Sequence, residues 1–105
     1  MKYTLNDIRG ASYVFNASTR TIQLIGVSQQ LTKTNFLGII DATTNIIIMQ
    51  ANSPAKGIAS VVNNLITLDY NTSSLSNSDE LQFIFDLPYI NNEDVVDSTS
   101  WIRKL

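Results

Sequence analysis

The chain contains no histidine and no cysteine, and each absence removes a class of chemistry. Histidine is the usual side chain for proton transfer near neutral pH. Without cysteine there are no disulfides, thiolate nucleophiles or zinc fingers, which suits a protein made in a reducing cytoplasm. The sequence also has no nucleophile elbow and no glycine-rich phosphate loop. We therefore expect no enzymatic activity and no cofactor.

Charge is scarce as well: charged residues make up 15% of the 105 residues, and the formal net charge is -2. The basic residues are scattered and form no stripe that could neutralise phosphates, so we expect no nucleic-acid partner. They are Lys2, Arg9, Arg20, Lys33, Lys56, Arg103 and Lys104. Asn, Ser and Thr supply about 30% of the chain. Such a surface repels itself weakly and suits packing against identical copies, although an AT-rich genome would also favour Asn.

Long hydrophobic runs are absent too. The longest apolar stretches are residues 36–40 and 46–49, far short of the roughly 20 residues that cross a bilayer. The first seven residues contain no apolar core of a signal peptide. We therefore expect no membrane partner.

What the sequence does contain is a period-two pattern typical of β-strands. Apolar and polar residues alternate or cluster in about seven short segments that turn residues separate. The expected strands are residues 12–15, 20–25, 36–40, 45–50, 58–62, 65–70 and 81–86. Tight turns fit between them, as at Asn63 and Asn64, because Asn tolerates positive φ. The pattern predicts an all-β fold, an antiparallel β-sandwich or a small barrel, of which we favour the sandwich.

The two ends differ from this central pattern, so we divide the chain into residues 1–11, 12–88 and 89–105. In the first part, Thr4 and Asp7 have the spacing of a capping box, and Gly10 can adopt a left-handed conformation. This part is expected to be an N-terminal arm or helical turn. Residues 12–88 would form the β-sandwich, which ends at Pro88.

Residues 89–105 are expected to form an extended C-terminal arm. They carry the only tryptophan, in a terminal cluster of Trp101, Ile102, Arg103, Lys104 and Leu105. Large apolar side chains at a terminus must bury somewhere. They either fold back on their own sandwich or dock on a neighbouring subunit, and Trp and Arg are enriched at binding hot spots. We select these five residues as the candidate partner-binding site.

The polar loop over residues 69–80 has two interpretations. Asp69, Asn71, Ser73 and Glu80 stand at calcium-ligand offsets of an EF-hand loop, but Ser74 occupies the glycine position and the flanks are strands. The favoured interpretation is structural: the polar side chains bond their own backbone, Leu75 points inward, and Asp79 closes a turn.

Carboxylates that could work as a pair are also present, at Asp41, Asp69, Asp79 and Asp86. Acid–base work by two carboxylates requires both within several ångström in a cleft. The sequence gives no reason to bring any two of these four together.

Residues 64–83, NLITLDYNTSSLSNSDELQF, resemble a stretch found in small virion proteins of tailed bacteriophages. Leu75 stands where that family commonly has Met, and Phe83 stands where it commonly has Ile. The order and spacing of residues 12–22, 36–49 and 54–57 also look similar, so the resemblance covers about residues 12–86. It carries no catalytic residue. It implies a virion structural protein, made in the host cytoplasm, whose partners are other capsid or tail subunits.

Within the particle we favour a capsid decoration, or cement, protein over a neck, tail, baseplate or fibre component. The Ile-rich strand edges of a free monomer are an aggregation hazard that a homo-oligomer or symmetric assembly would remove. In the arm, Trp101 and Ile102 would be buried anchors, and Arg103 and Lys104 would pair with acidic groups. The alternatives are a receptor- or carbohydrate-binding β-module that uses Tyr13, Tyr70 or Tyr89, and a calcium-stabilised module.

Overall fold

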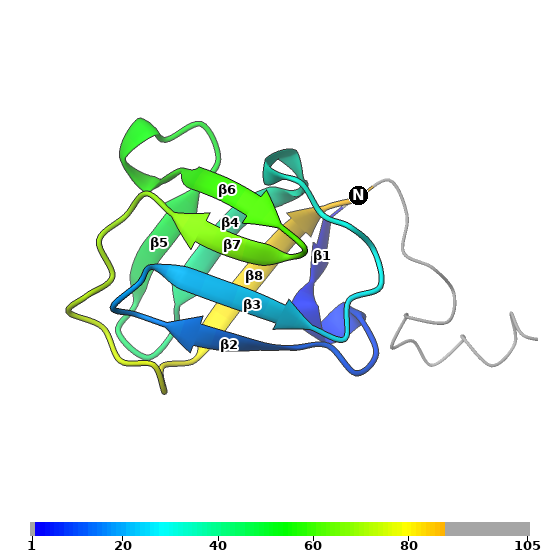
Figure 1. Cartoon of the computed structure of the whole chain (residues 1–105), viewed down its shortest axis with the longest axis horizontal. Helices are drawn as coiled ribbons and strands as arrows, with labels where there is room; N and C mark the ends of the chain where they lie inside the picture. The colour runs from blue at the N-terminus through cyan, green and yellow to red at the C-terminus, as the bar shows by residue number, and fades with distance from the viewer. Residues whose placement is uncertain (1, 88–105) are drawn as a thin grey trace, which may run out of the picture.

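Two four-stranded antiparallel sheets pack face to face in the computed structural model, which describes residues 2–87 (Figure 1). This confirms the predicted all-β sandwich. One sheet has the order β1-β8-β4-β5 and the other β2-β3-β7-β6. The strands are β1 (Lys2–Thr4), β2 (Ser12–Asn16), β3 (Thr21–Ile25), β4 (Phe36–Asp41), β5 (Ile46–Gln50), β6 (Ile58–Val62), β7 (Leu65–Leu68) and β8 (Leu81–Asp86). Three single-turn 3-10 helices, η1 (Leu5–Asp7), η2 (Lys33–Asn35) and η3 (Pro54–Lys56), lie between strands.

The chain visits the two sheets as successive hairpins. The β2–β3, β4–β5 and β6–β7 hairpins each lie within one sheet, and the next hairpin lies in the other. The first and last strands, β1 and β8, pair with each other, so that Lys2 faces Asp86 and Thr4 faces Ile84. Turn residues allow these reversals: Asn63 and Asn64 have φ of 50° and 60°, as the sequence predicts for a tight hairpin turn.

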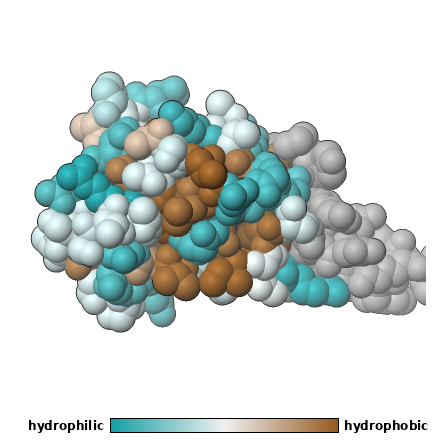
Figure 2. Space-filling model, viewed as in Figure 1, coloured by the Kyte–Doolittle hydropathy of each residue, from teal (hydrophilic) through white to brown (hydrophobic). Residues whose placement is uncertain are grey.

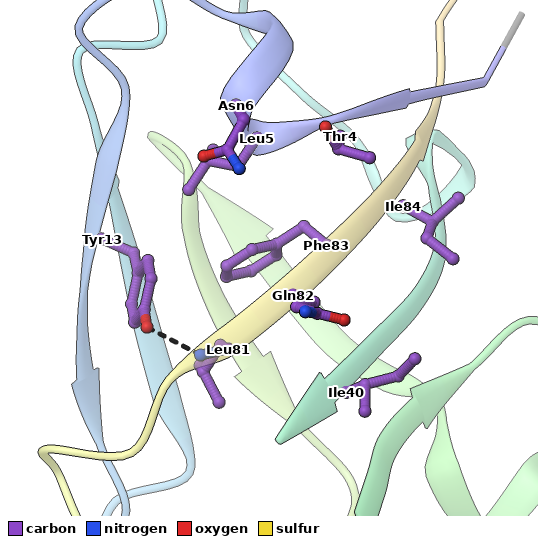
Figure 3. Close-up of a pocket in the computed structure, with 9 residues that line it drawn as sticks. All are labelled: Thr4, Leu5, Asn6, Tyr13, Ile40, Leu81, Gln82, Phe83 and Ile84. Atoms are coloured by element: carbon purple, nitrogen blue, oxygen red, sulfur yellow. Dashed lines mark hydrogen bonds between the residues drawn. The ribbon is translucent and has the colours of Figure 1, made fainter. Parts of the chain in front are cut away.

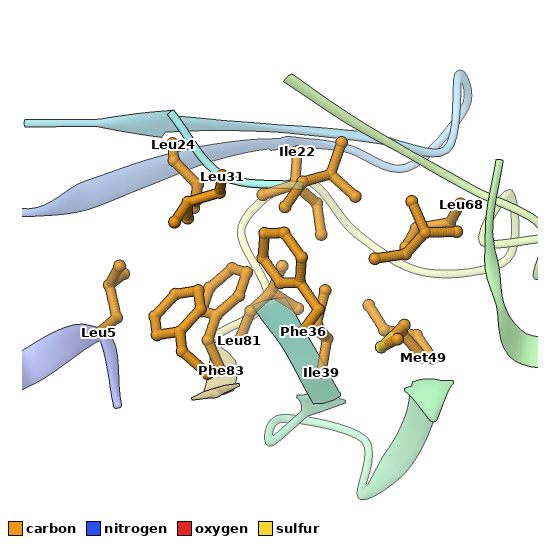
Figure 4. Close-up of a cluster of buried hydrophobic side chains, with 14 of the residues drawn as sticks. Leu5, Ile22, Leu24, Leu31, Phe36, Ile39, Met49, Leu68, Leu81 and Phe83 are labelled. Atoms are coloured by element: carbon orange, nitrogen blue, oxygen red, sulfur yellow. The ribbon is translucent and has the colours of Figure 1, made fainter. Parts of the chain in front are cut away.

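The core forms between the inner faces of the sheets (Figure 4), and in strands such as β3 and β8 inward residues alternate with outward ones. Ile22, Leu24 and Ile66 project from one sheet, and Phe83 and Phe85 project from the other. The Phe83 and Phe85 rings stack with centroids 5.9 Å apart. Aromatic pairs of this kind add to the stabilisation from burial.

The N-terminal segment belongs to this sandwich. Residues 2–8, which the sequence analysis sets apart as an arm or helical turn, supply edge strand β1 and the buried side chains of Leu5 and Ile8. The expected helical turn is present as η1, where the Thr4 amide donates to the Asp7 Oδ2 at 2.7 Å. β1 was not predicted, because its three residues include one half-buried apolar side chain, Tyr3.

Candidate functional site

The outer face of the β2-β3-β7-β6 sheet carries no charged side chain. Its outward positions, set by the pairing register and the alternation of burial, hold only aliphatic and neutral polar residues. They are Ser12, Val14, Asn16, Thr21, Gln23, Ile25, Ser60, Val62, Leu65 and Thr67. We call this set the neutral face. Figure 2 shows hydrophobic residues gathered over the middle of this sheet.

One cross-strand row of the neutral face is largely aliphatic. Register places Val14, Gln23, Leu65 and Val62 side by side across all four strands. Val62 is 61% exposed, Val14 57%, Ile25 45% and Leu65 37%. Exposed apolar patches with a polar rim mark contact surfaces for other molecules.

Two polar residues of the neutral face, Gln23 in the row and Thr21 at its rim, have internal partners. The Gln23 Nε2 donates to the Leu24 carbonyl at 3.1 Å and to the Asn63 carbonyl at 3.2 Å. The Thr21 hydroxyl bonds the Thr19 hydroxyl at 2.8 Å. Burying a polar group costs the most free energy when the group leaves water and finds no hydrogen-bond partner in the protein. Covering the neutral face therefore carries a small desolvation penalty at these residues.

The outer face of the other sheet is mixed in character. It carries a cross-strand Lys2–Asp86 register pair beside exposed Ile47 and Ile84. Within residues 2–87, the outer face of the β2-β3-β7-β6 sheet is thus free of charged side chains, and the outer face of the other sheet is not. The exposed aliphatic residues lie in strands that the sequence located, but the row across four strands depends on a strand order that the sequence does not give.

The predicted partner-binding residues Trp101, Ile102, Arg103, Lys104 and Leu105 lie outside the described residues. The expected C-terminal arm, residues 89–105, lies there too. The neutral face is a surface that the sequence reasoning did not select.

The 69–80 loop holds the β2–β3 turn. The buried Thr72 hydroxyl donates to the Ala17 carbonyl at 2.6 Å, and the Ala17 amide donates to the Asn77 Oδ1 at 2.7 Å. Leu75 packs against the core, as predicted. The Asp79 amide donates to the Ser76 carbonyl at 3.0 Å, which is the predicted turn closure. The loop therefore shapes the crossing between β7 and β8 through bonds to its own backbone and to Ala17.

The calcium interpretation finds no support in the geometry of this loop. The Asn71 Oδ1 accepts a bond from the Ser73 amide at 3.0 Å. Among residues 2–87, no group of three or more acidic, histidine or cysteine residues lies close enough to bind a metal ion.

Two carboxyl groups from distant parts of the chain meet where this loop approaches the end of β4. Asp41 ends β4 and is 0% exposed, while Asp79 precedes β8 and is 8% exposed. The Asp41 Oδ1 accepts from the Thr44 amide at 3.1 Å, and the Asp79 Oδ2 accepts from the Ser76 amide at 3.3 Å. The Asp41 Oδ2 is buried and receives no donor from any described residue.

The pKa of Asp79 is raised above its ordinary value, chiefly because a proton on its carboxyl group can be shared with the carboxyl group of Asp41. Burial raises this pKa further, the Ser76 amide lowers it, and the negative charge of Asp41 raises it again. Asp41 and Asp79 are two of the four carboxylates noted in the sequence, but 37 residues separate them there. They meet because β8 pairs with β4, which places Asp41 opposite Leu81.

The tyrosines required by the carbohydrate-binding alternative do not form a flat platform in the described residues. The Tyr13 hydroxyl accepts from the Leu81 amide at 2.7 Å (Figure 3). It donates to the Asp79 carbonyl at 3.3 Å. The Tyr70 ring is covered by Lys56, whose Nζ lies 5.0 Å from the ring centroid. Tyr89 lies outside the described residues.

A cavity of about 380 Å³ opens beside Tyr13, between β8 and the segment formed by β1 and η1 (Figure 3). Apolar side chains of Leu5, Ile40, Phe83 and Ile84 line most of it. Tyr13 is the one titratable residue among those that line it, so this cavity offers no acid–base pair.

Comparison with protein-family models, with curated proteins and with solved structures finds no match. Within residues 2–87, no helix is long and apolar enough to cross a membrane.

Proposed function

We propose that this chain is a non-enzymatic structural protein of a tailed-phage particle, and specifically a capsid decoration protein that reinforces contacts between capsid subunits. The single observation that carries the proposal is the neutral face. A sheet face without charge, with an aliphatic row whose one polar member, Gln23, is internally bonded, suits packing against another protein subunit.

The sequence resemblance supports the same class of protein. It covers about residues 12–86, and this span contains seven of the eight strands that residues 2–87 form. The segment with the greatest similarity, residues 64–83, includes β7, the 69–80 loop and the start of β8. These are elements that build the sandwich, as befits a protein whose role is structural.

The proposed mechanism is passive. The neutral face packs against a neighbouring subunit in the particle, while residues 89–105 reach a second subunit through Trp101 and Ile102. Arg103 and Lys104 pair with acidic groups of the partner. Aromatic anchors in a desolvated pocket supply most of the energy of such contacts, and many copies on a symmetric shell multiply weak contacts.

The first test is mass spectrometry of gradient-purified particles from the phage that encodes the chain. We expect the chain in the particles at a copy number comparable with that of the major capsid protein. A copy number of a few per particle would move the protein to the neck, tail or baseplate. Absence from the particles would overturn the proposal.

The second test changes the neutral face. Val14→Lys together with Val62→Lys should lower incorporation into particles by tenfold or more, because two charges must then be buried at the contact. The matched control is Ile47→Lys with Ile84→Lys, which places two lysines on the outer face of the other sheet. Thermal melts of both variants should stay close to that of the wild type. Equal incorporation of the two variants would exclude the neutral face as the contact.

A further inference from the structure

The 69–80 loop and the β4–β5 hairpin are joined at one small junction. The Ala42 amide donates to the Glu80 carbonyl at 2.8 Å, and the Glu80 amide donates to the Thr43 hydroxyl at 2.9 Å. The carboxyl groups of Asp41 and Asp79 meet beside these two bonds. The junction therefore combines two ordinary hydrogen bonds with one contact between acids.

The contact between the acids lacks one donor. The two carboxyl groups receive the amides of Thr44 and Ser76, and these leave the Asp41 Oδ2 without a partner. Two ionised carboxylates in contact also repel each other. A single proton on one carboxyl group removes the repulsion and supplies the missing donor, because the protonated group donates to the other.

No basic side chain of residues 2–87 is among the groups that shift the pKa of Asp79, so no cation takes the place of that proton there. The Arg20 guanidinium bonds the Asp69 carbonyl, and the Lys56 ammonium lies over Tyr70. The other titratable groups on the packed elements are Asp69, Tyr70 and Glu80 in the loop, Asp86 at the far end of β8, and the Tyr13 hydroxyl from β2. The β4–β5 turn and β5 contribute none.

We propose that Asp41 and Asp79 form a one-proton site that latches the 69–80 loop onto the β4–β5 hairpin, and that loss of this proton loosens the loop. The proposal is independent of the virion role. Loosening would extend beyond the loop, because Thr72 and Asn77 of the loop hold both backbone groups of Ala17 in the β2–β3 turn.

The sign of the pH dependence follows from the raised pKa of Asp79. The folded protein keeps the shared proton at a higher pH than the unfolded chain does. The stabilisation by the latch is therefore complete below the ordinary aspartate pKa and is lost as the pH rises through the raised pKa of the folded state. Carboxylates with lowered pKa values would show the opposite trend.

The test compares wild type with Asp79→Asn by urea unfolding between pH 4 and pH 8. In this variant the Asn amide can donate to the Asp41 Oδ2 at every pH, because its donor does not titrate. The quantity to compare is the ratio of the unfolding equilibrium constant of the wild type to that of the variant. We expect this ratio to rise from pH 4 to pH 8. The rise should be about tenfold for each pH unit by which the folded pKa exceeds the unfolded pKa. Glu80→Gln is the matched control, because it neutralises an exposed neighbour of Asp79. The ratio of the wild-type to the Glu80→Gln unfolding constants should stay constant with pH.

Carbon-13 NMR titration of the two aspartate carboxyl groups in the wild-type protein gives a second readout that needs no variant to fold. We expect one group to titrate above the ordinary aspartate range, and the Thr44 and Ser76 amides should shift with the same midpoint. The proposal would be overturned if both groups titrated in the ordinary aspartate range. It would also be overturned if the ratio of the wild-type to the Asp79→Asn unfolding constants did not change with pH. A wild-type melting temperature raised by millimolar Ca²⁺ at pH 7, with no rise in Asp79→Asn, would assign the site to a metal ion and would also overturn it.

Discussion

Single polar side chains fix the irregular parts of this sandwich, and Asn64 does so most extensively. It is buried in the β6–β7 turn. Its Nδ2 donates to the carbonyls of Val27 at 3.3 Å and Gln29 at 2.7 Å, and its Oδ1 accepts from the Leu31 amide at 2.8 Å. One amide thus bonds three backbone groups of the connection that carries the chain from β3 to β4.

Asn64→Gly should therefore destabilise the protein by about 2–3 kcal/mol, because buried backbone groups lose their partners. Glycine accepts the φ of 60° at this position, so the loss reports on the side-chain bonds and not on backbone strain. The measurement is the free energy of unfolding in urea.

Asn63→Gly is the control for this prediction. Asn63 has a φ of 50° in the same turn, but its side chain is exposed. Its change in stability should stay within about 0.5 kcal/mol. Similar losses in both variants would mean that the turn conformation, and not the Asn64 amide, fixes the connection.

Among the elements, the pairing of β1 with β8 joins the N-terminal segment to the sandwich. β1 has three residues and covers one edge of β8 from Ile84 to Asp86. η1 follows directly and places Leu5 in the core, and Ile8 is buried just beyond it. The N-terminal segment is therefore part of the folded domain by both pairing and burial.

Leu5→Ala should cost about 2–4 kcal/mol, because it removes a buried side chain and leaves a cavity. An unfolding curve in urea checks this value. Asn6→Ala in the same turn is the control, since Asn6 is exposed and its loss should be about 0.5 kcal/mol or less. A negligible loss in Leu5→Ala would mean that the segment is a detachable arm.

The sequence predicted elements better than their arrangement. Period-two alternation located strands such as β3 and β8, because inward residues such as Ile22 and Phe83 recur at every second position, and continuous apolar runs located β4 and β5. β1 has too few residues to show a period. The Asp41–Asp79 contact and the neutral face both depend on which strands are neighbours, and strand order comes from tertiary packing that no local pattern records.

For the whole molecule, the proposed assembly combines a rigid face with residues 89–105. The folded domain between Lys2 and Leu87 contains a core from both sheets without these residues. Assembly and folding should therefore be separable.

Removal of residues 89–105 should leave the melting temperature within a few degrees of that of the full chain. It should reduce any oligomer of the purified protein to a monomer, and it should abolish incorporation into particles. Light scattering and particle co-sedimentation measure these outcomes. Unchanged incorporation would exclude the arm, and a large fall in melting temperature would mean that these residues pack on their own sandwich.

The antiparallel pairing of the first and last strands also sets the mechanical behaviour of the domain. Because Lys2 lies opposite Asp86, the chain enters and leaves the sandwich at the same pole. Tension applied between these two points would open the β1–β8 ladder one residue pair at a time, as a zipper opens, and would not shear all its hydrogen bonds together. β1 would detach first, at low force, while the β8–β4 pairing in the middle of the same sheet still holds.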